Sequence, residues 1–182
     1  MVKTVAVMIG SLRKESINRK LAKSLEKLAG DRLQFHELHI GDLPHYNDDL
    51  WDNIPDAVAR FKDRLNNSDA VLAITPEYNR SYPGVIKNAI DWGTRPYGQN
   101  SWGGLPTTVT GASPGSIATA VAQAHLRSDL LTVGCIVMTQ PEAYIQWKPE
   151  AYAPDGSVTD ESTRLFLQGF VDNFVAWIDK HG

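Results

Sequence analysis

The sequence predicts an α/β fold in which helices cover both faces of a five-stranded parallel sheet, a three-layer sandwich. Short apolar runs alternate with longer amphipathic segments five times along the chain, which is typical of parallel β-α units. The 182 residues are the usual size of one domain, and 42% hydrophobic with 21% charged residues is an ordinary globular composition. Right-handed crossovers then favour the strand order 2-1-3-4-5, with residues 1–182 forming a single domain.

Five runs rich in apolar and β-branched residues are the expected strands. Each is short and bounded by glycine, proline or polar residues, as strands of a buried sheet are. They are Val2–Ile9, Leu33–Leu38, Ala70–Thr75, Thr107–Gly111 and Thr132–Met138.

Apolar residues spaced three or four apart predict a helix after each strand. The first begins after Ser16, a good N-cap residue, and the last carries a broad apolar face. The expected helices are Ile17–Leu28, Pro55–Leu65, Pro83–Trp92, Ser116–Ser128 and Glu161–Lys180. Two long segments without regular structure, Gly93–Gly104 and Pro141–Asp160, are of a length that usually serves function or an interface.

Three loops are expected to meet at one edge of this sheet. The segments Gly10–Ser16, Pro76–Tyr82 and Ala112–Gly115 directly follow the first, third and fourth strands. Ligands of doubly wound sheets bind outside the carboxyl ends of the strands, where the strand order reverses. The strand order therefore places a binding site among these loops.

The first loop has the donors that a phosphate monoester needs. Ser11 and Ser16 supply hydroxyls, Arg13 supplies a forked cation, and the first turn of the following helix supplies free N–H groups. The loop lacks both the G-x-G-x-x-G dinucleotide pattern and the ending of a Walker loop. It favours a single terminal phosphate, the alternative being a capped helix with an exposed arginine.

The second loop, Thr75–Gly84, suits a flat ring. Two prolines and two tyrosines surround a stretch whose backbone N–H groups belong to no helix, so a rigid loop can offer them to a ligand. An ordinary turn before a helix is the alternative, because proline and asparagine favour turns.

The third loop, Gly111–Gly115, matches the G-x-S-x-G elbow of serine hydrolases. That elbow takes an oxyanion-hole N–H from the residue after the serine, and here this residue is Pro114, which has none. We therefore interpret Ser113 as part of a turn beside a ligand and not as a nucleophile.

Other classes of function find little support in the residues. The formal net charge of -3 offers no basic field for nucleic acid or an anionic membrane. His36 and His39 point to opposite faces of a strand, which disfavours a metal site. Cys135 is the only cysteine, it is expected to be buried, and with no apparent signal peptide a reducing, cytoplasmic setting is expected.

Taken together, the loops resemble the NADPH-dependent FMN reductase family, a flavodoxin-like group that includes chromate, quinone and azo-dye reductases. The resemblance rests on GSLRKESINRKLA at 10–22, TPEYNRSYPGVIKNAIDW at 75–92, His125-Leu126-Arg127 and Gln140-Pro141-Glu142, in the right order. It covers nearly the whole chain, and it implies FMN as cofactor with NADPH or NADH as the electron donor.

The resemblance also assigns site residues. It implies that the FMN phosphate is held by Ser11, Arg13, Ser16, Ile17 and Asn18. It implies that the isoalloxazine ring is bordered by Pro76, Glu77, Tyr78 and Asn79, and that Ser113 and Gly115 close the site. Backbone N–H groups of Glu77–Asn79 would face the ring, so most side-chain changes in that segment are expected to be tolerated.

The activity so implied is two-electron, ping-pong transfer from NADPH through FMN to a small acceptor such as a quinone, an azo compound, free flavin or chromate. The flavin carries this chemistry, so no catalytic acid or base is expected in the protein. A homodimer or homotetramer is implied as well. The alternatives are a non-enzymatic electron carrier of the flavodoxin type, which usually lacks a phosphate-loop arginine, and a flavin-free interaction module.

Overall fold

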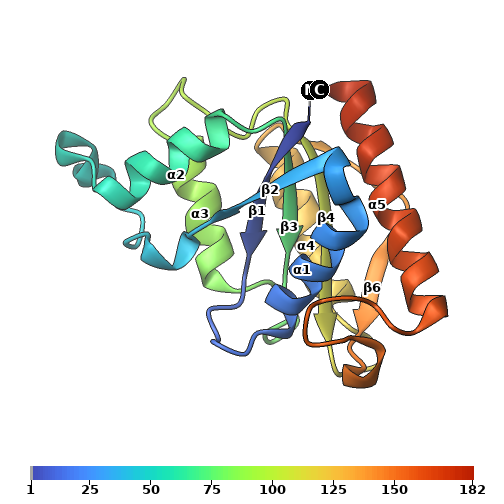
Figure 1. Cartoon of the computed structure of the whole chain (residues 1–182). Helices are drawn as coiled ribbons and strands as arrows, with labels where there is room; N and C mark the ends of the chain where they lie inside the picture. The colour runs from blue at the N-terminus through green and yellow to red at the C-terminus, as the bar shows by residue number, and fades with distance from the viewer. Residues whose placement is uncertain (1) are drawn as a thin grey trace.

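The sheet of this protein lies between two layers of helices, as seen in a computed structural model that describes residues 2–182 (Figure 1). The strands run in the order β2-β1-β3-β4-β5, and every pairing between them is parallel, which confirms the predicted order. The strands are β1 (Lys3–Ile9), β2 (Leu33–Leu38), β3 (Ala70–Ile74), β4 (Pro106–Ser113), β5 (Ile136–Val137) and β6 (Ala143–Gln146).

The fifth strand position is divided between β5 and β6, which the sequence prediction of one strand at Thr132–Met138 missed. β5 pairs with the beginning of β4 at Pro106 and Thr107, whereas β6 pairs with its end at residues 110–113. Between them lies Pro141, which has no N–H to continue a ladder. The predicted irregular segment Pro141–Asp160 therefore contains a strand that extends the sheet beside the third loop.

Five α-helices connect and follow the strands, and four of them begin and end within two residues of the predicted bounds. They are α1 (Ile17–Ala29), α2 (Asp56–Asn66), α3 (Gly84–Thr94), α4 (Ala120–Thr132) and α5 (Glu161–His181). Short 3₁₀ turns lie at Gly30–Arg32, Ile40–Asp42, Asp48–Asn53 and Pro149–Ala151.

Helix α4 is the exception, because the predicted span Ser116–Ser128 begins and ends four residues too early. Residues 116–119 form a turn, and Ala118 adopts a left-handed backbone conformation with φ of 53°. A helix cannot continue through such a residue, so α4 starts only after it.

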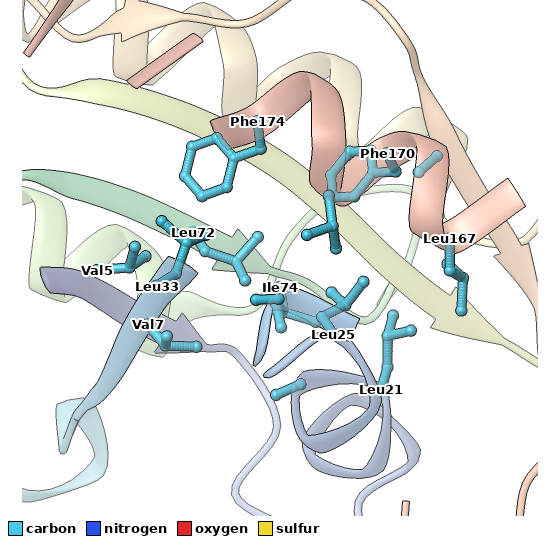
Figure 2. Close-up of a cluster of buried hydrophobic side chains, with 14 of the residues drawn as sticks. Val5, Val7, Leu21, Leu25, Leu33, Leu72, Ile74, Leu167, Phe170 and Phe174 are labelled. Carbon is cyan, nitrogen blue, oxygen red and sulfur yellow. The ribbon is translucent and has the colours of Figure 1, made fainter. Parts of the chain in front are cut away.

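The two faces of the sheet bury separate apolar clusters. Val5, Val7 and Ile9 of β1 pack with α1 and α5, and Figure 2 shows this cluster around Leu25 and Phe170. The alternate residues of β1, Ala6 and Met8, pack on the other face with α2, α3 and α4. Burial on both faces explains why the strands read as continuous apolar runs.

The strand register brings the three expected loops to one edge. Ile9 lies beside Ile74, and the N–H of Gly10 donates to the Ile74 carbonyl at 2.9 Å. The N–H of Thr75, the residue after β3, donates to the Thr110 carbonyl of β4 at 2.9 Å. A Cβ at Gly10 would lie 2.6 Å from Ile86 Cδ1, so a larger residue at this position would require the Ile86 side chain to move.

Candidate functional site

The three loops surround a cavity of about 240 Å³ at the carboxyl edge of β1, β3 and β4. It is lined by residues of all three loops, which are far apart in the sequence. The lining residues are Ser11, Arg13, Ser16, Ile17, Asn18, Pro76, Glu77, Tyr78, Ala112, Ser113 and Pro114. The cavity therefore brings together all the residues predicted for the site except Asn79 and Gly115, and it adds Ala112 and Pro114.

The beginning of α1 supplies anion donors to this cavity. Ser16 caps the helix, and its hydroxyl accepts from the Arg19 N–H at 3.2 Å. The N–H groups of Ile17 and Asn18 lie in the first turn, where helix geometry directs them away from the helix body. With the Ser11 hydroxyl and the exposed Arg13, these groups form a donor set that fits a phosphate dianion.

The side chain of Asn18, which the sequence placed at the FMN phosphate, instead bonds the backbone of Ala112. Its Nδ2 donates to the Ala112 carbonyl at 3.1 Å, and its Oδ1 accepts from the Ala112 N–H at 2.8 Å. Both bonds are buried, and they join the start of α1 to the end of β4. Asn18 therefore holds the first and third loops together, and its backbone N–H remains as a donor for an anion.

The second loop is a tight hairpin turn. The N–H of Tyr78 donates to the Ser81 carbonyl at 2.9 Å, and the Ser81 N–H donates back at 3.0 Å. Asn79 and Arg80 between them have φ of 52° and 64°, the conformation of a two-residue turn with both central residues left-handed. Because the Tyr78 N–H donates within the turn, only the N–H groups of Glu77 and Asn79 remain of the three donors predicted for this segment.

Glu77 links the second loop to α4. Its carboxylate accepts from the N–H groups of Val121 and Ala122, both at 3.1 Å, and from Arg80 at 3.1 Å. An anion at the beginning of a helix satisfies its free donors and interacts favourably with its dipole. We therefore expect Glu77 to be an exception to the tolerance predicted for most side-chain changes in this segment. Its capping partners lie more than 40 residues away and leave no local signal in the sequence.

The third loop forms a turn at the end of β4. The Ser113 hydroxyl accepts from the Gly115 N–H at 3.3 Å, which closes a turn at the end of β4. Pro114 follows in the cavity wall, and the Ser113 carbonyl accepts from the Trp147 N–H at 2.9 Å. Ser113 and Pro114 thus line the cavity, whereas Gly115 takes part through the hydrogen bond that closes the turn.

Two residues noted in the sequence lie away from this cavity. Cys135 is buried just before β5, and burial raises the pKa of its thiol to about 11, which disfavours the reactive thiolate. His125, which we expect to serve packing or an interface and not proton donation, is exposed on α4.

The aromatic residues of the long segments divide into two groups. Trp102 and Trp147 are buried and fix their segments to the protein body, whereas Tyr97 is 93% exposed. No helix within residues 2–182 is long and apolar enough to cross a membrane.

A doubly wound sheet whose switch point combines phosphate donors with a rigid turn defines a flavodoxin-like nucleotide-binding protein. Residues 3–149 match the model of the NADPH-dependent FMN reductase family, so the chain belongs to that family. It is an oxidoreductase with FMN as cofactor and NAD(P)H as electron donor.

Several known proteins are similar over nearly their whole length. A quinone reductase of Pseudomonas putida is 48% identical, covering 97% of this chain and 95% of the relative. A 2-hydroxy-1,4-benzoquinone reductase of Burkholderia sp is 43% identical, covering 96% of this chain and 95% of the relative. Among solved structures, the flavoenzyme NAD(P)H:(acceptor) oxidoreductase FerB from Paracoccus denitrificans is 72% identical with a TM-score of 0.99, and the match covers 100% of both chains.

Proposed function

We propose that the three-loop cavity holds FMN and that the enzyme passes electrons from NADPH or NADH to quinones. The observation that carries this proposal is the convergence of phosphate donors and the ring-binding turn on one cavity. The proposed cofactor-binding residues are Ser11, Arg13, Ser16, Ile17, Asn18, Pro76, Glu77, Tyr78, Asn79, Ser113 and Gly115.

The residues divide the work between the two ends of the cofactor. Ser11, Arg13 and the first turn of α1 hold the phosphate, and the rigid turn after β3 borders the ring. The N–H groups of Glu77 and Asn79 are the donors directed at developing negative charge on the ring edge. When bound, FMN supplies the two-electron carrier between hydride donor and acceptor, so no catalytic side chain is required.

Quinones are the acceptor class that the similar proteins favour. Two relatives at 43% and 48% identity carry quinone reductase names. Azo compounds, free flavin and chromate are further acceptors that an accessible reduced flavin can serve. Comparison of kcat/KM for a benzoquinone with those for an azo dye, riboflavin and chromate ranks them, and a quinone value below the others would contradict the assignment.

The donor and the acceptor are proposed to use the same place in turn. The nicotinamide nucleotide leaves before the acceptor enters, which is a ping-pong mechanism. Initial rates measured at several fixed acceptor concentrations should then give parallel lines in double-reciprocal plots, and intersecting lines would exclude it.

The experiment that tests the function is an anaerobic titration of FMN-loaded protein with NADPH. Stoichiometric loss of the visible flavin absorbance, restored by one equivalent of benzoquinone, is the expected result. FMN binding without bleaching would indicate an electron carrier of the flavodoxin type. Failure to bind FMN would contradict the assignment of the cavity.

We also propose that the protein works as a homodimer or homotetramer. The exposed side chains of Leu12 on the first loop, Tyr78 on the second loop and Ile117 in the turn before α4 offer apolar surface at the carboxyl edge of the sheet. Light scattering coupled to size-exclusion chromatography measures the mass, and a monomer at micromolar concentration would contradict this proposal.

A further inference from the structure

The outer edge of β6 is open. Within residues 2–182, β6 pairs with β4 and with no other strand. The Trp147 N–H donates to the Ser113 carbonyl of β4 at 2.9 Å. Because backbone groups alternate in direction along a strand, the N–H and carbonyl groups of Tyr144 and Gln146 point away from β4. No other backbone group of the described chain pairs with them.

The opposite edge of the sheet, formed by β2, is protected. There the Glu37 carbonyl accepts a hydrogen bond from Arg64 of α2 at 2.8 Å. Unpaired N–H and carbonyl groups on an edge strand are a template for another strand, so proteins usually cover or block such edges. The open edge of β6 is therefore a candidate for pairing with a strand of another chain.

An open cavity of about 260 Å³ lies along this edge. Its lining includes Tyr144, Gln146 and Lys148, together with Phe166 of α5, whose side chain is 47% exposed. In Figure 1 β6 lies at the edge of the sheet away from β2, beside the beginning of α5. A strand added to β6 would occupy this cavity and cover part of Phe166.

The sequence around β6 is complementary to itself when two copies run antiparallel. Exposed and buried residues alternate from Glu142 to Lys148, so the exposed side chains share one face. Pairing Tyr144 with the partner's Gln146 places Glu142 opposite the partner's Lys148, and a twofold axis repeats both pairs. Opposite charges that face each other across paired strands are stabilising, whereas like charges are destabilising.

Neighbouring registers lose this charge match. A shift in one direction places Glu142 opposite the partner's Gln146, and a shift in the other places it opposite the partner's Glu150. Within its own chain Glu142 lies 3.7 Å from Arg127, which is too far for a hydrogen bond, and 40% of its side chain is exposed. Its carboxylate therefore remains available to a lysine of a second copy.

We infer that the protein forms a twofold dimer in which β6 pairs antiparallel with the β6 of a second copy, joining the two sheets into one. Tyr144 and the partner's Gln146 exchange backbone hydrogen bonds, and Glu142 pairs with the partner's Lys148. The twofold axis is perpendicular to the joined sheet, so both α5 helices lie on the same face, each with Phe166 near the junction.

This interface goes beyond the proposed function and does not depend on the cofactor. It also differs from the apolar surface that the three loops form at the carboxyl edge of the sheet. Either surface alone gives a dimer, and the two together give a tetramer.

Sedimentation velocity of the FMN-loaded, full-length protein tests the charge pairs. Glu142→Lys and Lys148→Glu each turn the attractive pairs into repulsive ones, so each should raise the dissociation constant of one association step at least about tenfold. An equimolar mixture of these variants places opposite charges at both pairs and should associate as the wild type does. Lys180→Glu, the same charge change at the far end of α5, should leave association unchanged.

A second pair of variants tests the backbone pairing. Gln146→Pro removes an N–H that points away from β4, so it should weaken the same association step at least about tenfold while the sheet stays intact. Gln146→Ala keeps the N–H and should weaken it less than about threefold. None of the substituted residues lines the three-loop cavity, so an FMN content equal to that of the wild type shows that each variant folds.

The outcomes separate this interface from the proposed function. Oligomers whose mass does not respond to the charge variants would overturn the pairing of β6 and leave the three-loop surface as the interface. Single charge variants that associate as well as their mixture would overturn it too. A wild type that is monomeric at micromolar concentration would also overturn it, and quinone reduction by that monomer would leave the proposed activity intact.

Discussion

Arg13 supplies the charged donor on the rim of the three-loop cavity. Replacing it with alanine should weaken FMN binding ~10- to 100-fold, because a charge-assisted hydrogen bond contributes ~1.5–3 kcal/mol. Calorimetric titration of the stripped protein measures the change. Lys14→Ala is the matched control, because it removes a neighbouring exposed cation that does not line the cavity. Equal losses of FMN affinity in the two variants would show that only the total positive charge matters and that Arg13 makes no specific contact.

Asn18 illustrates how a single buried side chain holds two loops in register. Asn18→Ala would leave the N–H and carbonyl of Ala112 buried without partners, which should lower the free energy of unfolding by ~2–4 kcal/mol. Urea unfolding of the flavin-stripped protein measures this loss. Asn173→Ala on α5, where the amide is exposed and bonds within its own helix, should change stability by less than ~0.5 kcal/mol.

At the scale of secondary structure, the beginning of α4 depends on a residue of another element. Glu77→Ala removes the acceptor for Val121 and Ala122 and should destabilise the protein by ~1–2 kcal/mol. Arg80→Ala removes only the exposed ion-pair partner of Glu77 and should cost less than ~0.5 kcal/mol. Equal losses in the two variants would show that the ion pair, and not the helix cap, carries the effect.

The N-cap of α5 predicts a defined pH dependence. Hydrogen bonds from Thr163 and Ser162 lower the pKa of Asp160 from 3.8 to about 2. A carboxyl group whose pKa is depressed on folding stabilises the protein above its unfolded pKa, and this contribution is lost as the pH falls through the folded value. The stability difference between wild type and Asp160→Ala should therefore be constant above ~pH 5 and shrink toward pH 2. Urea unfolding of both proteins at several pH values measures it, and a difference that does not change with pH would contradict the assignment.

The sequence predicted those elements whose signals are local. The apolar runs of β1 to β4 and the amphipathic faces of α1, α2 and α5 identify their own positions to within a few residues. The start of α4 depends on Glu77, and β6 depends on pairing with the end of β4, so neither has a local signal. The cavity residues were predictable because parallel strands bring their carboxyl ends to one edge, whereas the link between Asn18 and Ala112 is a tertiary contact.

At the scale of the whole molecule, the three-loop cavity is formed by segments that come together only when the chain is folded. Residues from the loops after β1, β3 and β4 line it, so a cofactor bound there contacts only the folded state. A ligand that binds only the folded state raises stability by ~2.7 kcal/mol at one hundred times its dissociation constant. Cofactor binding should therefore stabilise the entire domain and not one loop.

This stabilisation can be measured as a rise in melting temperature, and the contributions of the FMN ring and phosphate can be separated. In a domain of this size ~2.7 kcal/mol should raise Tm by roughly 5–10 °C, measured by scanning calorimetry of stripped protein with and without FMN. Riboflavin has the same ring but no phosphate, so at equal concentration it should give a smaller shift. Arg13→Ala should reduce the difference between the two ligands, because Arg13 is expected to contact only the phosphate. An equal difference in wild type and variant would place the phosphate away from Arg13.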